Sequence, residues 1–259
     1  MEVVPLPSSR EIAELVADAV EQLVRAKPSA VIGLATGSSP LPAYHELIAR
    51  HRAGTAPAYD AVQWFLLDEY VGLPQGHPLS YRATIARELT DQLGVFDVHA
   101  PDPAPDDLPS AGERYERALA EAGGVDLQVL GIGSDGHLAF NEPGSSLTSR
   151  TRIKTLAEQT RADNARFFGS PDEVPTHVLT QGLGTILDAR HLVVVATGKA
   201  KAPAVAAAVE GPLSASCPAS VLQWHPHVTM LVDAGAASHL ERLDHYREVW
   251  TAKPGWQGI

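Results

Sequence analysis

The sequence is poor in cysteine, in basic residues and in long apolar runs, and each shortage excludes a class of protein. Its one cysteine, Cys217, cannot form an internal disulfide, which argues against a disulfide-stapled secreted domain and suits a reducing compartment. No apolar run approaches the roughly 20 residues needed to span a bilayer. The first residues also lack the basic and apolar regions of a signal peptide. We therefore expect a cytoplasmic protein.

Basic residues are outnumbered throughout the chain. Lysine and arginine number 20 against 31 aspartates and glutamates, which gives a formal net charge of −11. Nucleic acids and anionic membranes are bound through clustered basic surfaces, so this balance argues against both as partners. A small anionic substrate is compatible with it, provided that a few cations are concentrated at one place.

What the sequence does contain is an alternation of two kinds of apolar segment. Helical spacing of apolar residues marks 9–26, 39–51, 80–93, 110–122, 158–168, 200–209 and a segment from about 235. Short apolar runs typical of buried strands occur at 30–35, 62–67, 126–133, 191–196 and 228–232. The alternation predicts one α/β domain over 1–259, with a doubly wound, mostly parallel sheet and helices on both faces. The less patterned segment 144–180 is a candidate mobile lid.

The segment that bears most on function is the glycine-rich loop 131–143, which follows the predicted strand 126–133. It places Asp135, His137 and Glu142 within eight positions. Ligands of open α/β sheets bind beyond the carboxyl ends of the strands, so these proton-transfer groups lie where a substrate is expected. A histidine paired with a carboxylate is a competent acid–base catalyst near neutral pH. The alternative is a core histidine that hydrogen-bonds a backbone carbonyl.

A second acidic position ends the strand at 62–67. Asp68 and Glu69 follow the apolar residues of that strand directly. Because a carboxylate beside so much apolar surface should have a raised pKa, Asp68 is a candidate general base. The alternative is a carboxylate that caps the following turn.

Two further strand ends carry the features of an anion site. Gly37, Ser38 and Ser39 precede a proline at the start of a helix, where free backbone N–H groups attract anions. Lys199 and Lys201 occupy the corresponding position after the strand 191–196. Ordinary helix caps are the alternative for both. The sequence alone leaves the two interpretations open.

A metal site at Asp135, His137 and Glu142 is a further interpretation of the loop. No second histidine lies at ligand spacing from His137. We therefore predict no metal ligands in this chain.

Longer motifs give a resemblance that covers nearly the whole chain. They are the loop 131–143, Leu67-Asp-Glu-Tyr-Val-Gly-Leu, Ser149-Arg-Thr-Arg-Ile-Lys-Thr-Leu, Asn164-Ala-Arg-Phe-Phe and Ala208-Val-Glu-Gly. Together and in this order they resemble the glucosamine-6-phosphate deaminase family, also called the glucosamine-6-phosphate isomerase family. The family fold is a modified doubly wound α/β sheet, in agreement with the pattern above.

The resemblance implies a reaction and roles for the site residues. D-Glucosamine 6-phosphate and water would give fructose 6-phosphate and ammonium, in amino-sugar catabolism, without metal, nucleotide or other cofactor. His137 would open the sugar ring, with Asp135 and Glu142 orienting it, and Asp68 would move the C2 proton to C1. The substrate phosphate would bind Gly37, Ser38, Ser39, Arg166 and Lys201. Of the two lysines after the strand 191–196, the resemblance thus selects Lys201 and not Lys199.

The resemblance also implies regulation and assembly. Hexameric bacterial members bind N-acetylglucosamine 6-phosphate at an allosteric site between subunits. The matching positions here are Ser145, Arg152, Lys154, Thr155 and Tyr246. The resemblance therefore implies a homo-oligomer, of which the hexamer is one form.

The sequence departs from the family pattern at positions that bear on which amino sugar is the substrate, and three other functions are alternatives. Ser134 replaces a usual asparagine, and Ala-Thr-Gly-Ser-Ser at 35–39 replaces Pro-Thr-Gly-Gly-Thr. Galactosamine-6-phosphate deaminase is one rival, because the 34–41 segment and Pro-Ala-Ser at 218–220 resemble that branch. A 6-phosphogluconolactonase-like hydrolase shares the Gly-x-Gly-x-Asp-Gly-His loop. A non-enzymatic sugar-phosphate sensor is the third.

Overall fold

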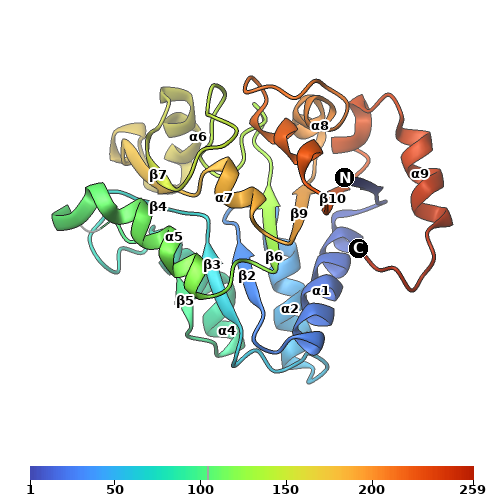
Figure 1. Cartoon of the computed structure of the whole chain (residues 1–259), viewed down its shortest axis with the longest axis horizontal. Helices are drawn as coiled ribbons and strands as arrows, with labels where there is room; N and C mark the ends of the chain where they lie inside the picture. Colours follow the sequence, from blue (N-terminus) through green and yellow to red (C-terminus); the bar gives the residue numbers. More distant parts are fainter. Residues whose placement is uncertain (104) are drawn as a thin grey trace.

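A parallel sheet forms the centre of this computed structural model, which describes residues 1–103 and 105–259 (Figure 1). Within these residues seven strands run in the order β1-β10-β9-β6-β2-β3-β5, and every pairing is parallel. In that order the strands are β1 (Glu2–Pro5), β10 (Val228–Val232), β9 (His191–Ala196), β6 (Leu127–Gly131), β2 (Val31–Leu34), β3 (Gln63–Leu66) and β5 (Val98–His99). The predicted doubly wound α/β fold is confirmed.

The direction in which the sheet is built reverses between β2 and β6. From β2 the chain adds β3 and β5 on one side, whereas β6, β9 and β10 extend the sheet on the other. The strands β2, β9 and β10 are buried at every position, which is why they read as continuous apolar runs. A reversal of this kind leaves a crevice beyond the carboxyl ends of the two strands, where ligands bind in such folds.

A second, antiparallel sheet was not predicted from the sequence. Its order is β4 (Asp68–Tyr70), β8 (His177–Thr180) and β7 (Arg152–Thr155), and it places Asp68 opposite Thr180. The strands have three or four residues each, and two of them carry charged side chains. They are therefore too short and too polar to give an apolar period.

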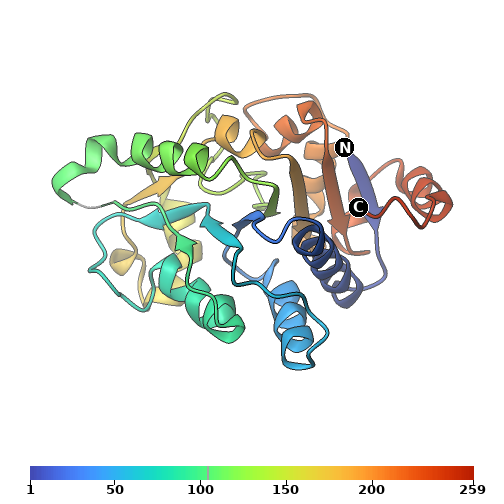
Figure 2. The same ribbon diagram turned by 60° about the horizontal axis from the view of Figure 1, so that its bottom comes forward.

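Helices cover both faces of the parallel sheet, as predicted (Figure 2). They are α1 (Ser9–Ala26), α2 (Leu41–Arg52), α3 (Tyr81–Ile85), α4 (Asp91–Leu93), α5 (Ala111–Glu121), α6 (Glu158–Phe168), α7 (Leu183–Leu187), α8 (Ala202–Val209) and α9 (Leu243–Ala252). A π-helical turn (Ala86–Thr90) joins α3 to α4. Apolar residues of α1 and α2 pack on one face, and those of α5, α7 and α8 pack on the other. The helix α6 lies above the carboxyl edge (Figure 1) and buries none of its residues.

The predicted C-terminal helix begins later than expected. Ala236–His239 form a 3-10 turn, and α9 starts only at Leu243. The cause is Glu210, whose carboxylate accepts hydrogen bonds from the backbone N–H groups of Glu241 at 2.8 Å and Arg242 at 3.0 Å. These bonds hold the chain between the turn and the helix in a non-helical conformation.

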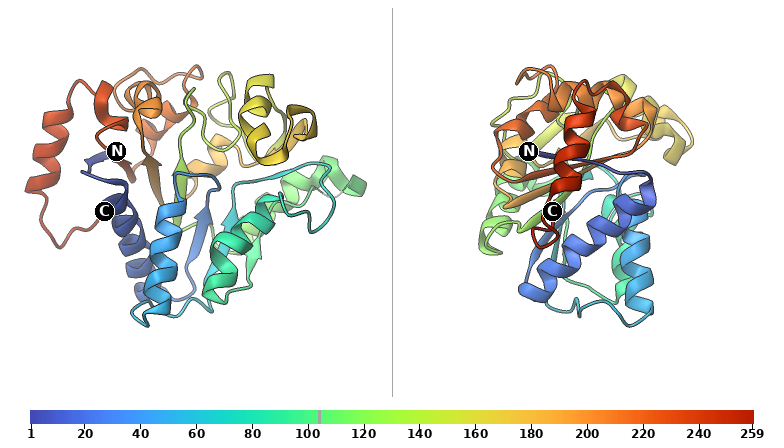
Figure 3. Two further views of the ribbon diagram at one scale, coloured as in Figure 1. Left: turned by 180° about the vertical axis from the view of Figure 1, so that it is seen from behind. Right: turned by 90° about the vertical axis from the view of Figure 1, so that its right-hand side faces the viewer.

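The two ends of the chain lie on the same side of the molecule, near β1 and α1 (Figure 3). None of the helices in the described ranges is long and apolar enough to cross a membrane.

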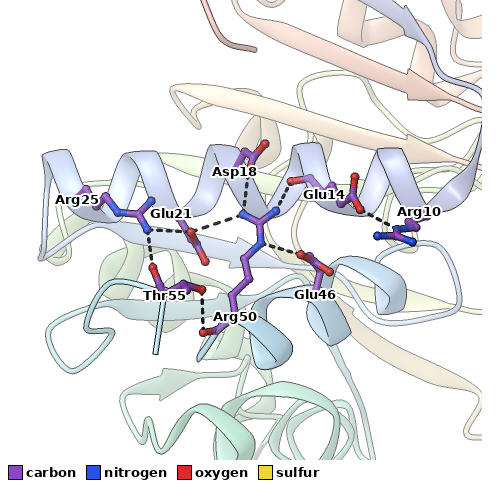
Figure 4. Close-up of polar contacts among 8 residues, drawn as sticks. All are labelled: Arg10, Glu14, Asp18, Glu21, Arg25, Glu46, Arg50 and Thr55. Atoms are coloured by element: carbon purple, nitrogen blue, oxygen red, sulfur yellow. Dashed lines mark hydrogen bonds and ion pairs between the residues drawn. The ribbon is translucent and has the colours of Figure 1, made fainter. Parts of the chain in front are cut away.

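Charged side chains join α1 to α2 (Figure 4). The Arg50 guanidinium lies 2.6 Å from a carboxylate oxygen of Asp18, 2.8 Å from Glu46 and 3.6 Å from Glu21. Glu21 is buried, with 5% of its side chain exposed, and Arg25 is its other ion-pair partner, at 3.0 Å. Removing a cation from a buried carboxylate destabilises the folded protein, so this network depends on Arg50.

We expect Arg50→Met to lower the free energy of unfolding by about 1–3 kcal/mol, because Glu21 stays buried and keeps only one cation. Urea unfolding followed by circular dichroism measures the change. Arg10→Met is the matched control, since Arg10 pairs with Glu14 at 2.8 Å but is 86% exposed. Equal stability of the two variants would show that Arg50 holds no buried charge in place.

Candidate active site

Four strand ends meet at the carboxyl edge of the parallel sheet. The loop 36–39 follows β2, Asp68 follows β3, the loop 131–143 follows β6 and residues 197–201 follow β9. The first and third of these loops touch, because a Cβ added at Gly131 would lie 3.6 Å from the Cβ of Ser39. The carboxyl edge thus gathers the proton-transfer groups and the anion loops that were predicted separately.

In the loop 131–143, Asp135 fixes His137. Nδ1 of the imidazole lies 2.6 Å from Oδ1 of Asp135, and the backbone N–H of His137 donates to the same oxygen at 3.1 Å. The hydrogen-bonding contact with His137 lowers the pKa of Asp135 to about 2. The carboxylate therefore stays ionised and can stabilise a protonated imidazole.

Gly133 makes room for the imidazole. A Cβ at this position would lie 2.2 Å from His137 Nδ1, which is far inside van der Waals contact. The neighbouring Ala139 has a φ of +51°, a left-handed conformation that is unusual for a residue other than glycine. Strain of this kind is typical of loops that hold side chains for chemistry.

The carboxylate of Glu142 is directed to the start of α6. Its Oε1 accepts from the backbone N–H of Ala157 at 3.3 Å and from the hydroxyl of Thr160. The predicted action of Glu142 on His137 stays a prediction. In this conformation Glu142 connects the loop 131–143 to α6.

Asp68, the first residue of β4, lies just beyond the end of β3 and is buried, with 6% of the residue exposed. Burial, and secondarily the charge of Glu69, raises the pKa of Asp68 to about 8. The raised pKa predicted from the apolar surroundings is confirmed, and it suits a group that takes and returns a proton near neutral pH.

The capping alternative applies to Glu69 instead. Its carboxylate accepts from the backbone N–H groups of Tyr70 at 2.9 Å, Tyr81 at 3.0 Å and Arg82 at 3.0 Å. These bonds fix the turn between β4 and α3. Glu69 is thus the carboxylate that caps this turn.

Of the two lysines after β9, Lys201 is the more buried. Lys199 is exposed, whereas Lys201 is half-buried. Burial lowers the pKa of Lys201, with Arg166 adding to the effect and Asp135 opposing it. The charges of Arg166 and Asp135 thus both act on Lys201, as the predicted anion site beside the loop 131–143 requires.

Arg166 was indicated only by the resemblance and not by any pattern of its own. It lies on α6, is exposed, and places its guanidinium 4.8 Å from the centre of the Phe167 ring. A single arginine on a polar helix gives no sequence signal. Only the fold brings it near Lys201.

In the loop 36–39, Gly37 has a φ of +103° and Ser38 is exposed. Pro40 precedes α2, and no side chain caps the first turn of this helix. Within this turn Pro42 has no N–H, and the N–H of Ala43 donates to the carbonyl of Pro40 at 3.0 Å.

The five positions predicted for allosteric control are spread over the molecule. Arg152, Lys154 and Thr155 lie on β7, and Ser145 is buried in the loop before it. Tyr246 lies on α9, where its hydroxyl donates to Glu210 at 3.1 Å. Figures 1 and 3 place α9 and β7 at opposite ends of the molecule. One chain therefore does not bring Tyr246 to the other four.

Across the residues that the structure describes, no three histidine, cysteine, aspartate or glutamate side chains are arranged to hold a metal ion.

The fold and the site together define a class of parallel α/β proteins with acidic, histidine and basic side chains gathered at the carboxyl edge of the sheet. The chain belongs to the family of glucosamine-6-phosphate isomerases and 6-phosphogluconolactonases, whose sequence model matches residues 8–231. This membership confirms the resemblance that the motifs predicted.

Relatives at high identity carry one activity. The glucosamine-6-phosphate deaminase of Pseudarthrobacter chlorophenolicus is 61% identical over 261 residues, and that of Mycolicibacterium smegmatis is 57% identical over 262 residues. Both alignments cover the whole of both chains.

Solved structures agree with this grouping. A monomeric glucosamine-6-phosphate deaminase aligns with a TM-score of 0.89 and 38% identity, covering 92% of this chain and all of that one. The 6-phosphogluconolactonase of Trypanosoma brucei aligns at 22% identity with a TM-score of 0.73, over 92% of this chain and 98% of that one. The second likeness shows the shared fold alone.

Proposed function

We propose that this protein is a glucosamine-6-phosphate deaminase, which converts D-glucosamine 6-phosphate and water to D-fructose 6-phosphate and ammonium. The observation that carries the proposal is the placement of two separate proton-transfer units, Asp68 after β3 and the Asp135–His137 pair after β6. Ring opening and proton transfer between two carbons are separate steps, and each needs its own acid–base group. The full-length relatives at 61% identity bear the same activity.

In the first step His137 opens the pyranose ring. The imidazole takes the proton of the C1 hydroxyl and supplies a proton to the ring oxygen, which leaves an open-chain aldehyde. Asp135 holds Nδ1 and stabilises the imidazolium that forms between the two transfers.

In the second step Asp68 takes the C2 proton and the enolamine forms. The same carboxyl group returns a proton at C1, which leaves an imine at C2. Water adds to this imine, and the resulting carbinolamine expels ammonia. Proton transfer and hydrolysis balance the reaction, with one water consumed for each ammonium released.

The phosphate is held by Lys201, Arg166 and the loop 36–39. We infer that α6 acts as a lid, within the segment 144–180, because it carries Arg166 and buries none of its residues. Substrate phosphate bound to Arg166 would draw this helix toward the sheet edge.

The proposal is tested by ammonium release from purified protein with glucosamine 6-phosphate, and with galactosamine 6-phosphate as the rival substrate. We expect stoichiometric fructose 6-phosphate and ammonium from the glucosamine compound and a lower kcat/KM with its epimer. Release of ammonium from neither compound would overturn the deaminase function.

We also propose a cytoplasmic homo-oligomer that N-acetylglucosamine 6-phosphate activates. Because β7 and α9 lie at opposite ends of one chain, an effector site containing Arg152 and Tyr246 would have to form between subunits. The monomeric deaminase named above is the opposite case. Light scattering and rates measured with and without the effector decide: a monomer with unchanged rates contradicts this assembly and leaves the deaminase function standing.

Replacing Lys201 with methionine should raise KM for glucosamine 6-phosphate about 10- to 100-fold, because one charge-assisted hydrogen bond to phosphate is lost. The value of kcat should fall less. Lys199→Met is the matched control, since Lys199 is exposed and only two positions away. Initial rates over a range of substrate concentrations separate the two parameters. If KM rose in the Lys199 variant alone, Lys199 and not Lys201 would bind the phosphate.

A further inference from the structure

The two proton-transfer units are not neighbours in the sheet. Asp68 follows β3 and His137 follows β6, and β2 lies between these strands. Hydrogen bonds within the parallel sheet therefore do not link the two units directly. Some other contact must set their separation, which catalysis requires to within a fraction of an ångström.

Residues 180–181, at the end of β8, contact the strand that carries Asp68. The backbone N–H of Gln181 donates to the carbonyl of Leu67 at 2.8 Å. Its side-chain Nε2 donates to the carbonyl of Leu66 at 3.2 Å. Two donors of one residue thus hold the two carbonyl groups that immediately precede Asp68.

The same two residues contact the loop that carries His137. The Gln181 carbonyl accepts from Asn141 Nδ2 at 2.8 Å, and the Thr180 hydroxyl accepts from the backbone N–H of Phe140 at 3.2 Å. Asn141 Nδ2 also donates to the carbonyl of Leu138, next to His137, at 3.0 Å. The loop is thereby held on both sides of the strained Ala139.

Water is excluded from this group of contacts. Thr180 and Asn141 are fully buried, and Gln181 is 1% exposed. Buried hydrogen bonds have fixed geometry because water does not compete for the partners, and losing one leaves an unpaired polar group.

We propose that Asn141, Thr180 and Gln181 form a buried cross-tie that sets the separation of Asp68 from His137, with Gln181 as a positioning residue of the reaction. This inference rests on the proposed deaminase function. It assigns to the small antiparallel sheet a task in catalysis, because β8 bonds to both halves of the site. The cross-tie acts through Asp68 and His137 and does not itself touch the substrate.

Gln181→Met tests the cross-tie, since methionine fills the same space and cannot donate to Leu66. We expect kcat to fall about 10- to 100-fold, as for other small misplacements of reacting groups, with KM nearly unchanged. We also expect the rise of kcat/KM with pH, which reflects deprotonation of Asp68, to occur at lower pH. A loosened site admits water to that carboxyl group, and hydration lowers its pKa.

Gln128→Met is the matched control. Gln128 is also a glutamine that is 1% exposed, and its Nε2 donates to a backbone carbonyl, that of Val129, at 2.9 Å. It does not join the two halves of the site. Its replacement should lower stability without changing kcat or the pH profile.

Thr180→Val, which keeps the side-chain shape and removes the acceptor for Phe140, carries the test if the Gln181 variant does not fold. Wild-type protein must first release ammonium; its failure to do so refutes the function, not the cross-tie. With an active wild type, a folded Gln181→Met or Thr180→Val variant with wild-type kcat and pH profile would overturn the cross-tie. Equal losses of kcat in the Gln181 and Gln128 variants would overturn it as well.

Discussion

Asp68→Asn is expected to lower kcat by roughly a thousandfold or more, because the amide cannot take the C2 proton and the loss of a general base costs up to about four orders of magnitude. Substrate binding should change little, since the phosphate contacts lie on other strand ends. In the wild-type enzyme kcat/KM should rise with pH up to about 8, the raised pKa of Asp68. Ammonium release under saturating substrate measures the first effect, and its pH dependence the second.

Stability provides the control for this variant. The pKa of Asp68 is raised to about 8 in the folded protein from an ordinary value of 3.8. Between these pH values the folded chain binds the additional proton, so its free energy of unfolding falls as pH rises. Asparagine removes that dependence, and the variant should be at least as stable as the wild type at pH 8. An Asp68 variant that is stable and fully active would exclude Asp68 as the base.

His137→Gln is expected to lower kcat roughly 100- to 10,000-fold, because ring opening loses its acid–base group. Exchange of the C1 hydrogens of fructose 6-phosphate in deuterated ammonium buffer provides a second measurement. That exchange uses Asp68 and bypasses the pyranose ring, so the His137 variant should retain more of it than the Asp68 variant does. Proton NMR follows both activities.

Gly133→Ala gives a matched variant in which the imidazole is kept. The added methyl group would lie 2.2 Å from Nδ1, so the ring must shift, and we expect its 2.6 Å contact with Asp135 to lengthen. We expect a loss of kcat in the same direction as for His137→Gln, and a pKa of Asp135 that rises toward its ordinary value. Deamination at the wild-type rate by both His137→Gln and Gly133→Ala would contradict the ring-opening role of His137.

The parallel sheet was predictable because its strands are buried on both faces. The run 191–196 was predicted as a strand and coincides with β9, which is buried at every position. Likewise α1 has the predicted bounds, because its apolar residues recur with helical spacing. The order of apolar and polar residues along the chain records these elements directly.

The antiparallel sheet was not predictable, because β4 is made of Asp68, Glu69 and Tyr70 and exists only through its pairing with β8. The same is true of the site. Asp68 and His137 could be proposed from the strand ends on which they lie. The contacts of Gln181 with both halves, and the direction of Glu142 toward α6, depend on tertiary structure that no local pattern records.

The most direct measurement follows glucosamine 6-phosphate carrying deuterium at C2 by NMR, with the wild-type protein and the Asp68→Asn variant. With the wild type we predict loss of the C2 deuterium in step with fructose 6-phosphate and ammonium, part of the label appearing at C1. The variant should leave the label in place. Absence of ammonium with the wild type, or loss of the label at the wild-type rate in the variant, would contradict deamination through Asp68.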